Sequence, residues 1–153
     1  MNEEQYIETD GSQTKYYSDK AMTVIHREDG PAVESANGDK KWYLNGKLHR
    51  EGGPAVEYND GEKAWYINGK CHREDGPAVE DTDGYKEWYL NGKLHREDGP
   101  AIEYTNGYKA WYINNKSLTE EEFNTRMSPT IELTLDEIAK KFGVSVDKLK
   151  IKK

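Results

Sequence analysis

The chain has 153 residues, a length that suits one domain or a small domain with an appendage. Only 34% of the residues are hydrophobic and 33% are charged, a composition that excludes a thick globular core. The 11 Tyr and 4 Trp can bury one side of each ring and keep a polar edge in water, which suits a thin structure. The net charge is -7, with -9 over residues 1–127 and +2 over residues 128–153, and this acidity argues against general nucleic-acid binding.

The first elements in chain order form a degenerate half-unit. Residues 6–10 and 15–17 flank Gly11, which predicts two strands joined by a turn. Nine positions then separate Tyr17 from His26, whereas six separate Tyr89 from His95, so three residues are inserted before the regular pattern begins.

A 23-residue repeat follows and dominates the sequence. The heptapeptide HREDGPA begins at three histidines and its variant HREGGPA at a fourth, and each is matched by a Trp-Tyr pair. The histidines are His26, His49, His72 and His95, and the tryptophans are Trp42, Trp65, Trp88 and Trp111.

Each unit contains two expected strands and two expected turns. In the unit of Trp88, residues 78–80 begin a strand, residues 82–84 form a turn and residues 86–90 form an aromatic-rich strand. Asn91-Gly92 favours a type I′ hairpin because both residues tolerate positive φ. Pro in the heptapeptide lacks an N–H donor, which predicts a loop there. Stacked units predict a mainly β fold, an antiparallel meander forming a single elongated twisted sheet.

The units alternate in type. Three sets of equivalent positions switch in step: 41, 64, 87 and 110; 44, 67, 90 and 113; and 35, 58, 81 and 104, the last set placing Tyr58 and Tyr104 in every second unit. The repeat can therefore also be described with a period of 46 residues. The alternation would arise either from duplication of a two-unit block or from different surroundings of neighbouring units.

The end of the repeat region is expected to be capped. Residues 119–127 predict a short helix with Thr119 as N-cap, which would cover the last strand edge and close a domain over residues 1–127. Residues 128–153 predict a separate small β-α-α-β module. Its strands are expected at 130–133 and 149–152, and its first helix at 135–142, with Thr134 and Glu137 as a capping box and Gly143 at its end.

The repeated histidines invite a metal or acid-base interpretation. Equivalent residues should lie ~10 Å apart, two strands away, whereas zinc ligands lie ~2.3 Å or less from one ion. We therefore expect structural histidines, no metal, no cofactor and no catalytic residues. The arginines that follow them are expected to pair with carboxylates along the sheet edge, and Asp29, Asp75 and Asp98 to accept hydrogen bonds from their own turns.

The aromatic rows are the candidate binding surface. One interpretation makes the Trp row internal packing with Tyr as its cover; the other places a ligand on the aromatic and arginine side chains. Cys71 occupies a slot held by Leu in other units and is expected to pack as an apolar residue. The candidate binding residues are Tyr43, Tyr66, Tyr89, Tyr112, Tyr58, Tyr104, Arg50, Arg73 and Arg96.

The period and the aromatic-x-Asn-Gly-Lys hairpin, over about residues 6 to 118, resemble MORN-type repeats, particularly the variant group of bacterial and viral proteins. The HREDGPA/WYxNGK arrays are similar to those in tailed-phage and giant-virus proteins. The string TLDEIAKKFGVSVDKLK is similar to the centre of LysM modules, which bind glycans, and to helix-turn-helix segments. The resemblance to MORN-type repeats implies a scaffold architecture and leaves the partner open.

The favoured functional hypothesis is a non-catalytic binding protein, plausibly phage-encoded, whose acidic repeat surface binds or inhibits a host or viral protein such as a defence factor. The first alternative is a protein that sequesters a small signalling nucleotide; the second is cell-wall glycan attachment through residues 128–153. No apolar run approaches membrane-spanning length, so we expect a cytoplasmic protein that does not enter a membrane, with an oligomer as an open possibility.

Overall fold

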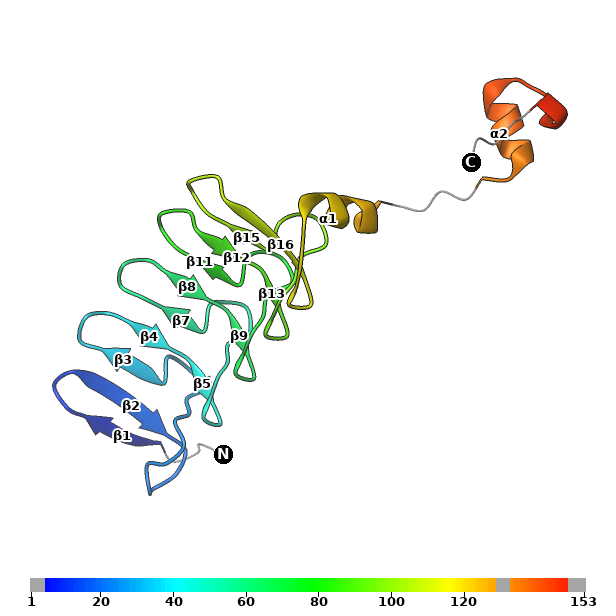
Figure 1. Ribbon diagram of the computed structural model, residues 1–153. Coiled ribbons are helices and arrows are strands. Elements are labelled where there is room, and N and C mark those ends of the chain that lie inside the picture. The colour runs from blue at the N-terminus through cyan, green and yellow to red at the C-terminus, as the bar shows by residue number, and fades with distance from the viewer. Residues whose placement is uncertain (1–4, 129–132, 149–153) are drawn as a thin grey trace.

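A computed structural model describes residues 5–128 and 133–148. An antiparallel sheet in meander order runs the length of the repeat region (Figure 1), as the sequence predicts. Its eleven strands are β1 (Tyr6–Thr9), β2 (Gln13–Tyr17), β3 (Val33–Ser35), β4 (Lys40–Lys41), β7 (Val56–Glu57), β8 (Lys63–Ala64), β11 (Val79–Glu80), β12 (Lys86–Glu87), β15 (Ile102–Glu103), β16 (Lys109–Ile113) and β17 (Lys116–Leu118).

Each of three units also carries a second hairpin beside this sheet (Figure 1). These hairpins are β5 (Tyr43–Leu44) with β6 (Lys47–Leu48), β9 (Tyr66–Ile67) with β10 (Lys70–Cys71), and β13 (Tyr89–Leu90) with β14 (Lys93–Leu94). The prediction of two strands per unit is therefore wrong in two respects: the aromatic-rich strand is divided at its Trp, and a further strand, such as Lys93–Leu94, follows the Asn-Gly turn.

The division has a hydrogen-bonding cause. The Trp88 N–H donates to the carbonyl of Ala101 in the next unit, at 2.8 Å, while the Trp88 carbonyl accepts from the His95 N–H at 3.0 Å. One residue thus bonds to the sheet on one side and to the hairpin on the other. Trp111 has no following unit of this kind, and its strand β16 continues unbroken from Lys109 to Ile113.

The Asn-Gly turns have the expected type I′ signature. Asn91 has φ 53° and Gly92 has φ 78°, and the pairs at 45–46 and 68–69 have similar values. The Gly92 N–H donates to the Cys71 carbonyl of the preceding unit at 2.8 Å, so each turn is bonded to its neighbour. The hairpins therefore form a second row of units parallel to the long sheet.

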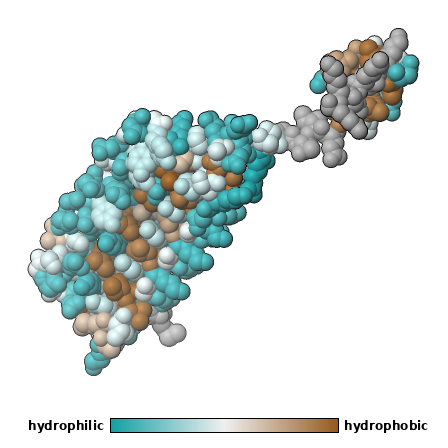
Figure 2. Space-filling model, in the orientation of Figure 1, coloured by the Kyte–Doolittle hydropathy of each residue, from teal (hydrophilic) through white to brown (hydrophobic). Residues whose placement is uncertain are grey.

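The core is thin. The alanine of each heptapeptide, at 32, 55, 78 and 101, is fully buried, and none of the larger described side chains is. Val33, Val56 and Ala64 extend this interior along the sheet. Figure 2 shows an apolar band along the repeat array, flanked by hydrophilic side chains.

The repeat region ends as expected at helix α1 (Glu120–Met127). Thr119 caps it through a complete capping box with Glu122, and Phe123, only 5% exposed, is its buried residue. The helix contacts β16 and β17 at the last edge of the sheet.

Helix α2 (Leu135–Phe142) begins at Thr134 with a capping box to Glu137 and ends at Gly143 in the left-handed conformation, as predicted. A short 3-10 helix, Val146–Lys148, follows it. The strands expected at 130–133 and 149–152 fall outside the described residues, apart from Leu133. In the described part of the chain, no helix has the length and apolar character needed to cross a bilayer.

Candidate functional site

The heptapeptide loop is built around an arginine that stacks on a tryptophan. The Arg96 guanidinium carbon lies 3.9 Å from the centre of the Trp88 ring. Arg96 Nε donates to Asp98 at 2.7 Å, and its Nη1 donates to the Pro100 carbonyl at 3.1 Å and to Glu103 at 2.9 Å. The arginine therefore fixes the ring, the loop and the adjoining strand together.

The same arrangement recurs in the other units, with a tyrosine replacing Trp in the first. The ring contacts are Arg27 on Tyr16 at 4.0 Å, Arg50 on Trp42 at 3.8 Å and Arg73 on Trp65 at 4.1 Å. The expected pairing of arginines with carboxylates is confirmed.

The loop aspartates have a partner beyond the expected one. They were predicted to accept from their own turn's backbone, and Asp29, Asp75 and Asp98 also accept from arginine Nε at 2.7–2.8 Å. These hydrogen bonds lower the pKa of each of the three carboxyl groups. Both groups in the arginine–aspartate bond are charged, so it is stronger than the bond of the same carboxylate to a backbone N–H.

Gly52 breaks this pattern in one unit. Where the other loops carry Asp, Gly52 has φ 74° and open space around it. Arg50 keeps its bonds to Pro54 and Glu57 but lacks the Nε partner, and its side chain is 33% exposed, against 19–23% for Arg27, Arg73 and Arg96. The guanidinium of Arg50 is therefore neutralised by fewer carboxylates than the guanidinium groups of the neighbouring units.

The histidines join successive units. Each accepts, through Nδ1, the backbone N–H of the Asn in the next unit's turn: His26 from Asn45, His49 from Asn68, His72 from Asn91 and His95 from Asn114, at 3.0–3.3 Å. Their Nε2 atoms lie 3.4–3.9 Å from the glutamate two residues on. Within residues 5–128 and 133–148, no three His, Cys, Asp or Glu side chains group as metal ligands.

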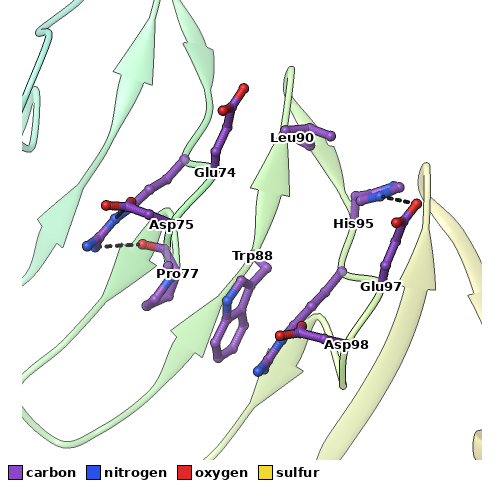
Figure 3. Close-up of a pocket in the computed structure, with 11 residues that line it drawn as sticks. Glu74, Asp75, Pro77, Trp88, Leu90, His95, Glu97 and Asp98 are labelled. Atoms are coloured by element: carbon purple, nitrogen blue, oxygen red, sulfur yellow. Dashed lines mark hydrogen bonds and ion pairs between the residues drawn. The ribbon is translucent and has the colours of Figure 1, made fainter.

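A groove lies between each pair of adjacent loops. In the one drawn in Figure 3, Trp88 stands between the loop of Asp75 and Pro77 and the loop of Asp98. The groove has a volume of about 610 Å³, and Leu90, two residues after Trp88, lines it as well. The equivalent grooves surround Trp42 and Trp65. The structure thus places three Trp rings and all four repeat arginines along one series of grooves.

The tyrosines fall into two groups. Tyr43, Tyr66, Tyr89 and Tyr112 are half-buried, and burial raises the pKa of Tyr89 to about 12. Burial likewise raises the pKa of the Cys71 thiol to about 12, in keeping with its expected packing role. These tyrosines are not among the residues that line the three grooves.

The second tyrosine group is exposed. Tyr104 is 45% exposed and lies 4.6 Å from Tyr85 and 5.6 Å from Tyr108, measured between ring centres, whereas Tyr58 lies beside Lys41. Sequence reasoning missed Tyr85 and Tyr108. Both directly follow a turn glycine, where earlier units carry Asp or Glu, and this change along the repeat was the available signal.

The chain matches no family model, no curated protein and no solved structure. The resemblance to MORN-type repeats therefore stays a prediction.

Proposed function

We propose that the chain is a non-catalytic binding protein that uses its repeated loop surface to bind another protein. The observation that carries the proposal is the series of three equivalent grooves at 23-residue intervals, each containing a Trp ring and bounded by two loops. Repeated shallow sites suit a long contact with an extended or repetitive partner, because each unit adds a similar increment.

Charge indicates the kind of partner. The glutamates at the groove rims, Glu28, Glu51, Glu74 and Glu97, are 72–88% exposed, and the repeat region as a whole is acidic. Such a surface attracts basic proteins and repels phosphate backbones. We favour a host or viral protein with a basic surface, a class that includes defence factors.

The nucleotide alternative would place phosphates on the repeat arginines. Arg27 and Arg96 each bond to two carboxylates, and Arg73 bonds to one at 2.8 Å with a second at 4.0 Å. A phosphate on Arg27, Arg73 or Arg96 would have to displace these pairs and would meet the exposed rim glutamates. This arrangement favours a protein partner over a nucleotide.

The test is affinity capture with the full chain as bait, followed by measurement of Kd with the purified partner at several salt concentrations. We expect a stoichiometric basic protein whose affinity falls as salt rises. The doubly substituted Glu74→Lys, Glu97→Lys chain should lose at least tenfold in affinity, whereas Glu120→Lys, Glu121→Lys on the capping helix should change it less than twofold. Equal affinity of both variants would rule out the groove surface as the binding site.

A further inference from the structure

The spacing of the grooves limits what can occupy several of them at once. Each unit adds two strands to the long sheet, and strands lie ~4.8 Å apart, so successive grooves repeat every ~9.6 Å. A polyproline II helix rises ~3.1 Å per residue with three residues per turn, so every third side chain returns to one face after ~9.3 Å. Its pitch matches the groove spacing to within a few tenths of an ångström.

Other extended conformations fit less well. In a β-strand the third residue points to the opposite face, because side chains alternate with a period of two. In an α-helix two turns, or seven residues, advance ~10.5 Å, and the mismatch of about 1 Å per groove accumulates along the array. The groove spacing therefore selects the polyproline II form.

The charges of the grooves differ in a defined order. The groove at Trp88 is lined by four carboxylates, Glu74, Asp75, Glu97 and Asp98, against two arginines. The groove at Trp42 is lined by three carboxylates against two arginines. Among the carboxylates, only Asp75 lines the central groove, at Trp65, against Arg50 and Arg73, and Gly52 stands where the other loops carry an aspartate. Counted over the lining residues alone, the order along the array is negative, positive, negative.

We infer that the loop surface binds a polyproline II segment of a partner protein with the pattern basic-x-x-acidic-x-x-basic, an inference that rests on the proposed protein-binding function. A lysine or arginine enters each outer groove, where its cation lies against the Trp ring and beside the rim carboxylates. The acidic residue enters the central groove and pairs with Arg50, whose Nε has no aspartate in its own loop.

The repeat arginine of the same unit covers one face of Trp88, and the ring stands in the groove opposite Pro77 of the preceding loop (Figure 3). The incoming cation would lie over the other face of the ring. A cation over an aromatic face gains about twofold to fivefold in affinity at an exposed site. The prolines between the charged positions lie over the loops. They also hold the free segment in the polyproline II conformation, so less conformational entropy is lost on binding.

The test is titration of the full chain with synthetic proline peptides, read by calorimetry and by tryptophan fluorescence. The matched peptide carries lysine, glutamate and lysine at every third position. We expect it to bind with a Kd on the order of 100 µM at low salt. A peptide of the same composition with the charges four positions apart should bind at least tenfold more weakly, as should a helical peptide with charges seven positions apart.

Two variants test the charge order. Asp29, Asp75 and Asp98 occupy the equivalent position in otherwise identical loops without positive φ, so Gly52→Asp can adopt their loop conformation. It should weaken the lysine-glutamate-lysine peptide about fivefold and strengthen an all-lysine peptide. Gly52→Asn, the neutral control, should change either affinity less than twofold. Circular dichroism serves as the check that both variants fold.

Equal affinity for the two spacings, tighter binding of the helical peptide, or identical behaviour of Gly52→Asp and Gly52→Asn would each overturn the inference. The proposed function can be judged separately. A captured basic partner that binds through the rim glutamates but is not displaced by the matched peptide supports protein binding and refutes the polyproline segment. Failure of capture together with failure of the peptides refutes both.

Discussion

The histidine that links two units offers the sharpest test of how the array is held together. His72 Nδ1 accepts the Asn91 N–H at 3.0 Å, and the His72 side chain is 18% exposed. Substituting Phe keeps an aromatic ring of similar size but removes the acceptor. The Asn91 amide lies at an exposed turn, so water can replace part of the lost bond, and the cost falls near the lower part of the usual range, about 1 kcal/mol.

Urea unfolding followed by tryptophan fluorescence measures this cost. With an m value of about 1.5 kcal/mol/M, the midpoint of His72→Phe should fall by about 0.7 M. His72→Asn is the matched control, because its Oδ1 can take the place of the lost acceptor although the ring is absent. We expect the midpoints to rank wild type, then Asn, then Phe.

The reverse order would refute the reasoning. Phe is more hydrophobic than His, so if ring packing and not the hydrogen bond links the units, His72→Phe should be as stable as the wild type and His72→Asn the least stable. The contact of His72 Nε2 with exposed Glu74, at 3.7 Å, is too solvated to alter this ranking.

Three further outcomes follow from the structure. The Arg73 hydrogen bond lowers the pKa of Asp75, so this carboxylate stabilises the fold above its unfolded-state pKa and loses that effect as the pH falls through the folded-state pKa. Asp75→Asn should therefore lower the urea midpoint at neutral pH, by an amount that decreases as the pH falls through the folded-state pKa of Asp75. Burial raises the pKa of Cys71 to about 12, so iodoacetamide at pH 8 should label the folded chain at least ~100-fold more slowly than the unfolded chain; similar rates would contradict the packing role. Phe123→Ala should cost ~3 kcal/mol and promote aggregation in light scattering, because the helix then uncovers the last strand, whereas exposed Asn124→Ala should do neither.

The parts of the fold that sequence reasoning predicted depend on local chemistry. The Asn91-Gly92 turn needs two residues that accept positive φ, and the helices after Thr119 and Thr134 need a capping box, all within a few positions of chain. A fixed period then extends one unit's prediction to the others. This explains why the meander, the hairpin turns and the helix bounds could be predicted.

The missed features depend on partners farther along the chain. Trp88 and Trp111 sit in similar local sequences, yet the strand divides at Trp88 and continues through Trp111. The difference lies in the acceptor at Ala101, which the following unit supplies to Trp88. The grooves were missed for the same reason, since the loop and the Trp that form one groove come from different units.

The fully buried alanine of each heptapeptide, such as Ala78, gives the array a further property. The only side chain at this position is a methyl group, and the alanine backbone is hydrogen-bonded to the adjoining strands on both sides. The local geometry is therefore the same in every unit. Inserting a second copy of residues 72–94 would then lengthen the protein by one step without disturbing the rest. The number of units therefore sets the length of the loop surface, and Gly52 marks a fixed position along it.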